Sequence, residues 1–194
     1  MIDKKTGIWT VNTGPSSTIH NAPTLHKYDP GLADALIHFL QDQDTIVDFG
    51  CGNADYTKLL VKENKTVECY DGNPNTPEMT DGLCKVLDLS KEFDLNKKFE
   101  CVISLEVGEH IPPEYEQIFI DNLDRHSAQC VILSWALPGQ GGDGHFNERD
   151  NSYIKENFEK RGYKNWIEAE NYLRESTTLW WFKNTIMVFL KKQK

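Results

Sequence analysis

The sequence predicts an α/β protein in which a doubly wound, mostly parallel sheet carries helices on both faces. Residues 44–60 read as a strand, a glycine turn and a helix in immediate succession, and apolar runs alternate with helical patterns along the rest of the chain. Parallel strands require such crossovers. The 194 residues suffice for one sizeable core but not for two ordinary domains. We therefore expect one domain over residues 30–194, preceded by an N-terminal lid or flexible segment over residues 1–29.

A helix is predicted to begin at Gly31 and to precede the first strand. Asp29 supplies a cap and Pro30 a first-turn proline. Apolar residues then recur at helical spacing, at Leu32, Ala35, Leu36, Phe39 and Leu40. We expect this helix to pack on the sheet.

The first strand and its glycine turn form a candidate cofactor seat. Residues 45–49 are mostly β-branched or apolar, contain Asp48 and lead directly into Gly50-Cys51-Gly52, after which a helical pattern starts at Ala54. The two glycines let a ligand lie close against the main chain. An ordinary tight turn between a buried strand and a helix is the alternative.

The kind of cofactor follows from what this turn lacks. A phosphate-binding P-loop needs a Lys followed by Ser or Thr after its second glycine, and neither is present. In a dinucleotide fingerprint the third glycine would fall at Asp55, whose carboxylate repels a pyrophosphate at a helix start. A nicotinamide oxidoreductase is therefore disfavoured, and a cofactor with an adenosine but no phosphates fits better.

An acidic residue ends the second strand-like run. Asp71 closes residues 66–70 and is followed by Gly72 and Asn73. It lies about twenty positions past the glycine turn, the spacing at which a doubly wound sheet presents an acid to ribose hydroxyls. Asp71 is thus a candidate ligand of an adenosine ribose.

Four stretches carry a resemblance to a known family. VDFGCGNAD, VECYDGN, KVLDLS and FECVISLEVGEHIP resemble, in order and spacing, the class I S-adenosylmethionine-dependent methyltransferases, over roughly residues 30 to 190. Ala54 departs from the family pattern, which often has a third glycine there. The resemblance implies a Rossmann-like, seven-stranded sheet whose last strand is antiparallel and reached by a hairpin, with S-adenosyl-L-methionine as cofactor and S-adenosyl-L-homocysteine as product. SLEVGEHIP is most similar to the small-molecule branch, which implies methyl transfer to an O or N atom of a small-molecule acceptor.

The resemblance and the strand ends together imply a set of cofactor-binding residues. A third strand over residues 83–87 ends at Asp88, and in the family an acid here and the next backbone N–H, that of Leu89, meet the adenine. The fourth strand, over residues 99–105, ends just before Glu106. The predicted set is Asp48, Gly50, Cys51, Gly52, Asp71, Gly72, Asn73, Asp88, Leu89, Leu105 and Glu106.

Ionisable residues follow the fourth strand, at the sheet edge where open α/β sheets bind ligands. Methyl transfer from a sulfonium is an in-line displacement, so the protein chiefly has to align the reacting atoms. A hydroxyl or ammonium acceptor must also lose a proton, for which an imidazole is suited. We predict His145, His110 and Glu109 as catalytic candidates and no metal ion. An architectural role for the Glu109–His110 pair and a helix-capping role for His145 are the alternatives.

The acceptor is expected beside the fifth strand. Residues 130–135 form this strand, and the loop that follows has four glycines among residues 139–144. The predicted substrate-binding residues are His26, Tyr28, Trp135 and Asn147, and hydroxyl, amine and carboxylate acceptors all stay open. Trp180 and Trp181 are expected to pack in the core and at an edge rather than to contact a cofactor.

The net charge argues against a nucleic-acid partner. It is −9, with an isoelectric point near 5.1, which opposes the phosphate neutralisation on which nucleic-acid affinity depends. We also consider a noncatalytic S-adenosylmethionine-binding or partner-binding domain on the same fold, because a fold does not prescribe its chemistry.

The cysteines and the apolar pattern predict a soluble, cytoplasmic protein. The five cysteines include no CxxC pair, so buried free thiols in a reducing compartment are expected rather than disulfides or a metal site. No apolar stretch is long enough for a membrane span, and the N-terminus lacks the apolar core of a signal peptide.

Overall fold

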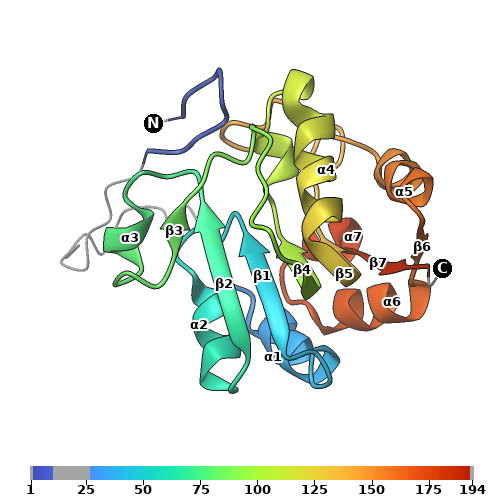
Figure 1. The fold of residues 1–194 in the computed structure, drawn as a ribbon. Helices are drawn as coiled ribbons and strands as arrows, with labels where there is room; N and C mark the ends of the chain where they lie inside the picture. Colours follow the sequence, from blue (N-terminus) through green and yellow to red (C-terminus); the bar gives the residue numbers. More distant parts are fainter. Residues whose placement is uncertain (1, 11–26, 193–194) are drawn as a thin grey trace.

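A computed structural model describes residues 2–10 and 27–192, and within them seven strands form one sheet in the order β3-β2-β1-β4-β5-β7-β6 (Figure 1). Strands β1 to β5 pair in parallel, whereas β7 is antiparallel to both of its neighbours, β5 and β6. The strands are β1 (Thr45–Phe49), β2 (Thr66–Asp71), β3 (Lys85–Val86), β4 (Phe99–Ser104), β5 (Ser127–Leu133), β6 (Tyr163–Asn165) and β7 (Met187–Lys191). The predicted fold class is confirmed.

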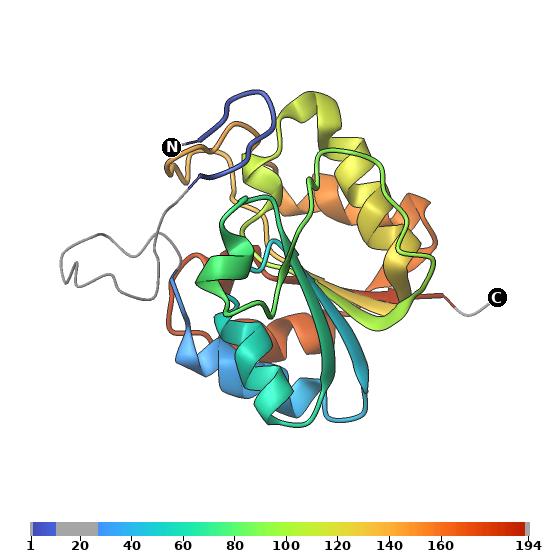
Figure 2. The ribbon, with the colours of Figure 1, turned by 60° about the vertical axis from the view of Figure 1, so that its left-hand side comes forward.

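Helices cover both faces of this sheet (Figures 1 and 2). One face packs against α1 (Pro30–Phe39), α2 (Asp55–Lys62), α6 (Ile167–Ser176) and α7 (Phe182–Thr185), and the other against α4 (Glu116–His126) and α5 (Asn151–Lys160). Shorter turns are α3 (Thr76–Met79) and the 3₁₀ turns η1 (Gly108–His110) and η2 (Pro113–Tyr115).

The strands contribute to two cores because successive side chains point to opposite faces of a sheet. In β1, Val47 and Phe49 belong to the cluster under α4 and α5, and Ile46 belongs to the cluster under α1 and α6. Burial on both faces explains why these strands read as continuous apolar runs in the sequence.

Helix α1 begins as its sequence predicts. Pro30 occupies the first turn, and one carboxylate oxygen of Asp29 accepts a hydrogen bond from the backbone N–H of Leu32 at 3.0 Å. The other oxygen accepts from the N–H groups of Thr178 and Leu179, at 2.8 and 2.7 Å. Asp29 therefore joins the start of α1 to the segment after α6.

One expectation for the C-terminal part is wrong. The last strand is not reached by a hairpin, because α6 and α7 lie between β6 and β7. Strand β6 ends at Asn165, and α6 begins two residues later at Ile167.

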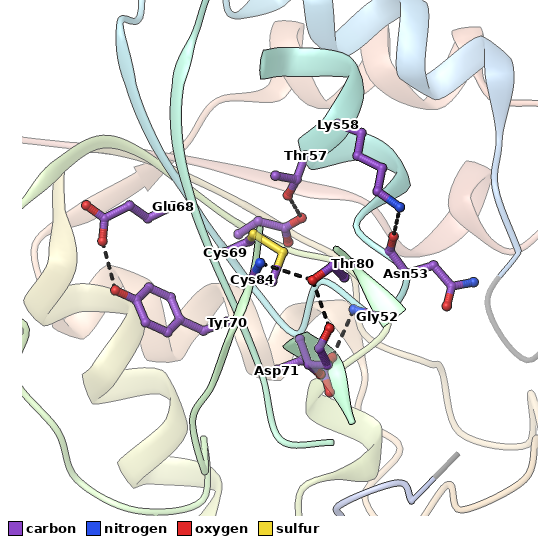
Figure 3. The surroundings of a disulfide bond; sticks show 12 residues. Gly52, Asn53, Thr57, Lys58, Glu68, Cys69, Tyr70, Asp71, Thr80 and Cys84 are labelled. Carbon is purple, nitrogen blue, oxygen red and sulfur yellow. Dashed lines mark hydrogen bonds between the residues drawn. A yellow bond between two sulfur atoms is a disulfide. The ribbon is translucent and has the colours of Figure 1, made fainter. Parts of the chain in front are cut away.

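The prediction of free thiols is wrong for two cysteines. Cys69 and Cys84 form a disulfide, with their Cα atoms 4.8 Å apart (Figure 3). Tyr70 in β2 pairs with Lys85 in β3, and this register places the residues just before them, Cys69 and Cys84, beside one another. Strand register, which a cysteine count does not reveal, therefore creates the bond. Cys51, Cys101 and Cys130 are free. The cytoplasmic location stays a prediction, and the expectation of free thiols no longer supports it.

Within the described part of the chain, no helix has the length and apolar character that crossing a membrane requires.

Candidate active site

A cavity of about 510 Å³ opens where β1, β2 and β4 end. Each of these strands delivers residues to its wall through the turn that follows it. Thirteen residues singled out from the sequence line it: Tyr28, Asp48, Gly50, Cys51, Asp71, Gly72, Asn73, Leu89, Leu105, Glu106, Glu109, His110 and His145.

The glycine turn is held against β2 by its backbone. The N–H groups of Gly50 and Cys51 donate to the carbonyl of Tyr70, at 2.7 and 3.2 Å. Gly50 has φ +86°, and a β-carbon there would come within 2.2 Å of Val107 Cγ2. Only glycine combines this backbone conformation with so close an approach.

Asp71 braces the same turn from the end of β2. One carboxylate oxygen accepts from the N–H of Gly52 at 2.9 Å (Figure 3). The other accepts from the N–H of Asn73 at 2.8 Å. Gly52 itself does not line the cavity, whereas Asp71 and Asn73 do. Asp71 thus ties the two turns together at the cavity wall.

Asp48 is a buried acid behind the turn. Thr57 Oγ1 donates to its carboxylate at 2.7 Å. Burial raises the pKa of Asp48 to about 7, and the charge of Asp71 adds to the rise while the bond from Thr57 opposes it. The carboxyl group therefore changes its charge near neutral pH.

Asp88 is not among the residues that line the cavity. Its carboxylate accepts from the backbone N–H and the hydroxyl of Ser90, at 3.0 and 2.6 Å, and pairs with Lys91 at 3.0 Å. Leu89 does line the cavity. The side chain of Asp88 thus bonds within its own turn, and its contact with an adenine stays a prediction.

Two acids gather on the opposite wall. Glu106 adopts a left-handed backbone with φ +54°, and its N–H donates to Ser134 Oγ at 2.7 Å. Glu109 is fully buried. Burial raises the pKa of both carboxyl groups, and the charge of Glu106 adds to the rise at Glu109.

Two imidazoles stand beside these acids. The rings of His110 and His145 lie 5.0 Å apart at 80° to one another. His110 Nδ1 lies 3.0 Å from the carbonyl oxygen of Gly144, and His145 Nδ1 lies 3.2 Å from Glu148 Oε1. Both partners accept only, so in each ring Nδ1 carries the proton and Nε2 is the basic nitrogen.

Two predicted substrate residues lie outside the cavity wall. Trp135 is fully buried in the core, and its indole N–H donates to the carbonyl of Asn147. Asn147 is also buried, and its side-chain amide donates to Glu116 at 3.0 Å. Both residues support the loop after β5 from below. The prediction for His26 lies outside the described residues.

Part of the predicted N-terminal segment contributes to the wall. Residues 6–9 line the cavity, and a β-carbon at Gly7 would come within 2.0 Å of the carbonyl oxygen of His110. Trp9 contacts the ring of His110 edge-on, with ring centroids 5.5 Å apart. Ile2 packs against Gly144, so this segment lies beside the loop after β5 (Figure 2). A lid function for the N-terminal segment stays a prediction.

The expectation for the tryptophan pair holds in part, because Trp181 packs against the core cluster under α1 and α6. Trp180 and Trp181 line the cavity together with Phe182, and Trp180 is 60% exposed. Asp29 fixes the backbone immediately before this pair. The sequence signal that could have indicated a place at the cavity was an aromatic-rich segment without helical or strand periodicity.

Comparisons with known proteins find similar solved structures. No family model matches the sequence, and no curated protein matches it. The fold is similar to magnesium protoporphyrin IX methyltransferase from Synechocystis, crystallised with S-adenosylhomocysteine, at TM-score 0.63 and 17% identity over 82% of each chain. It is similar to a TehB-like S-adenosylmethionine-dependent methyltransferase from Corynebacterium glutamicum, at TM-score 0.64 and 16% identity over 84% of this chain and 88% of the other.

A third similar structure is an amino pentose methyltransferase from Micromonospora echinaspora with S-adenosylmethionine bound. The TM-score is 0.60 and the identity 13%, over 83% of this chain and 89% of the other. These likenesses show that the chain has the fold of the class I S-adenosylmethionine-dependent methyltransferases, as its motifs predict.

Proposed function

We propose that the protein is a methyltransferase that moves a methyl group from S-adenosylmethionine to an oxygen or nitrogen atom of a small molecule. One observation carries the proposal. A single cavity is lined on one side by the glycine turn and Asp71 and on the other by Glu106, Glu109 and the two histidines. A candidate cofactor seat and a set of acid–base groups thus share one cavity, as catalysis by alignment requires.

The cofactor side suits an adenosine attached to a cationic chain. The carboxylate of Asp71 can accept hydrogen bonds from ribose hydroxyls, the role that the end of the second strand has in doubly wound sheets. Asp48 and Asp55 also line this side, and their charge favours a sulfonium and an ammonium. The bound cofactor would supply an activated methyl carbon.

The acceptor side offers shape and proton transfer. Trp181 and Phe182 give it apolar walls, on which an organic molecule can pack. The basic Nε2 of His145 or His110 can take a proton from a hydroxyl or ammonium group as the methyl group arrives. His145 stands on the glycine loop, and Glu148 orients its ring.

Two measurements on the purified protein test this function. Calorimetry with S-adenosylmethionine measures cofactor binding, and mass spectrometry with a panel of small alcohols, phenols and amines detects S-adenosylhomocysteine and the methylated product. We expect Asp71→Ala to weaken cofactor binding far more than it lowers the free energy of unfolding.

Asp121→Asn is the matched control for that variant. Asp121 is an exposed aspartate on α4, away from the cavity, and it forms an ion pair with Arg161. Unchanged cofactor affinity in Asp71→Ala would contradict the ribose role of Asp71.

The alternative is a noncatalytic S-adenosylmethionine-binding or partner-binding domain. Cofactor binding without product formation from any acceptor, in the same assays, would favour it over the enzyme.

A further inference from the structure

Three groups of metal-ligand type meet on the acceptor side of the cavity. Ligand atoms of Glu109, His110 and His145 all lie within 4.8 Å of one another, and all three residues line the cavity. We infer that this cluster binds a divalent transition-metal ion, which holds and activates an oxygen atom of the acceptor.

The state of Glu109 gives an independent reason. Its side chain is fully buried, and among the described residues neither carboxylate oxygen has a well-formed hydrogen bond, although the carboxyl group of Glu106 is near enough to share a proton with it. A buried carboxylate without donors is costly, and a cation in the cluster would compensate both oxygens.

The histidines are oriented as metal ligands usually are. A ligating imidazole commonly donates its other N–H to a carboxylate or a carbonyl, which fixes the ring and its tautomer. His145 donates through Nδ1 to Glu148, and His110 donates through Nδ1 to the carbonyl of Gly144. Nε2 is then the nitrogen of each ring that can bind a metal.

The partner of His145 is itself fixed. The carboxylate of Glu148 accepts from the backbone N–H groups of Gly139 and Gly141, at 2.6 and 2.7 Å. The glycine loop therefore holds Glu148, and Glu148 holds the ring of His145. Through these contacts the loop after β5 orients the imidazole of His145 at the cluster.

The ligand types select the metal. Two imidazoles and one carboxylate suit Zn²⁺, Fe²⁺, Co²⁺ or Mn²⁺ better than Mg²⁺ or Ca²⁺, which prefer oxygen ligands alone. Three protein ligands leave coordination positions open.

Glu106 lies on the same wall, and its interaction with Glu109 raises the pKa of Glu109.

An open position would take a hydroxyl oxygen of the acceptor. The metal would lower the pKa of that hydroxyl, and the proton would leave to solvent water. With the metal bound, Nε2 of His145 and His110 would be ligands and would no longer act as the base. The oxygen then forms a bond to the methyl carbon while the carbon–sulfur bond breaks, and the electron pair of that bond stays on sulfur. This use of the site rests on the proposed function, whereas metal binding does not.

Metal binding is tested directly on untagged, chelator-treated full-length protein. Calorimetric titrations with ZnCl₂ and MnCl₂, and loss of the free Mn²⁺ paramagnetic resonance signal, should give one site per chain. Glu109→Gln and His145→Ala should each weaken binding by about tenfold or more. His38→Ala, on α1 outside the cavity, is the matched control and should bind as the unaltered protein does.

The outcomes separate the two proposals. If neither metal binds, or if Glu109→Gln and His145→Ala both bind as tightly as His38→Ala, the metal site is refuted, and a cofactor titration still decides the methyltransferase. If the metals bind as expected but S-adenosylmethionine does not, the site stands and the proposed function fails.

Discussion

The indole ring of Trp135 lies directly beneath Gly108, so that a β-carbon on Gly108 would come within 2.2 Å of Trp135 Cε3. Gly108 opens the 3₁₀ turn that carries Glu109 and His110. The contact therefore sets the height at which both side chains stand above the sheet. Trp135, predicted from the sequence to bind substrate, lies beneath the turn and outside the cavity wall.

Replacing this glycine should disturb the turn. Gly108→Ala forces its β-carbon into the ring of Trp135, and such overpacking typically costs about 1–3 kcal/mol of stability. We expect urea denaturation to show this loss. In the double variant Gly108→Ala/Trp135→Leu, the smaller leucine side chain should leave room for the alanine and remove much of its loss of unfolding free energy. Strictly additive effects in this double-mutant cycle would contradict the steric explanation.

Asp48 should make stability depend on pH. Its pKa rises from an ordinary 3.8 to about 7 in the folded protein, so the folded state binds this proton more tightly than the unfolded state does. The resulting stabilisation is present at low pH and is lost as the pH rises from about 4 to about 7.

The variant Asp48→Asn removes that dependence. At pH 8 it should exceed the unaltered protein in unfolding free energy by an amount on the order of 4 kcal/mol or less, and by much less at pH 5. Urea titrations at both pH values measure the difference, with Asp121→Asn as control. An equal difference at the two pH values would argue against titration of Asp48.

Glu116 should be important for the loop after β5. This buried carboxylate accepts hydrogen bonds from Tyr153, Arg149 and Asn147. Burial alone would raise its pKa, but these bonds outweigh burial and lower the pKa below the ordinary 4.5. Its contribution to stability is therefore present above pH 4.5 and is lost as the pH falls through the lowered pKa.

We expect Glu116→Gln to lower the unfolding free energy at pH 7 by about 2 kcal/mol or more, because Arg149 loses its buried partner. The exposed neighbour Glu114→Gln should have little effect. The gap between the two variants, measured in urea, should narrow as the pH is lowered below 4.5. A gap that widens instead would show that the carboxylate does not stabilise the fold.

The disulfide should be stable toward the nearby free thiol. The sulfur of Cys51 lies within 4.8 Å of those of Cys69 and Cys84, but burial, together with the charges of Asp48 and Asp71, raises the pKa of the Cys51 thiol far above its ordinary value. A neutral thiol attacks disulfides slowly. Peptide mapping should find the bond between Cys69 and Cys84 alone, and an exchanged bond to Cys51 would contradict this.

Removing the disulfide should cost stability. The variant Cys69→Ser/Cys84→Ser opens a link that spans 15 residues, and we expect it to lose about 2–3 kcal/mol of unfolding free energy. Cys51→Ser, which keeps the bond, is the control. Equal stability of the two variants in urea would show that the bond does not stabilise the fold.

More of the residues predicted for the cofactor side than for the acceptor side lie at the cavity, for physical reasons. Gly50 follows β1 and Asp71 ends β2, and the parallel order of these strands brings their ends to one edge, so local pattern sufficed. Trp135 sits at a strand end where the ring can turn to either face, and packing against Gly108 decided the direction. The segment at residues 6–9 has no periodicity, and its position depends on contacts with residues about a hundred positions away, such as His110.

The two-sided contacts of Asp29 have a mechanical consequence. One carboxylate anchors the entry to the first helix and, 149 and 150 residues further along the chain, the backbone that presents the tryptophan pair. The chain's path into the domain and the aromatic rim of the cavity therefore cannot shift independently. Removing residues 1–34 would therefore free the backbone before the tryptophan pair from Asp29, in addition to taking away the part of the cavity wall that residues 6–9 and Tyr28 form.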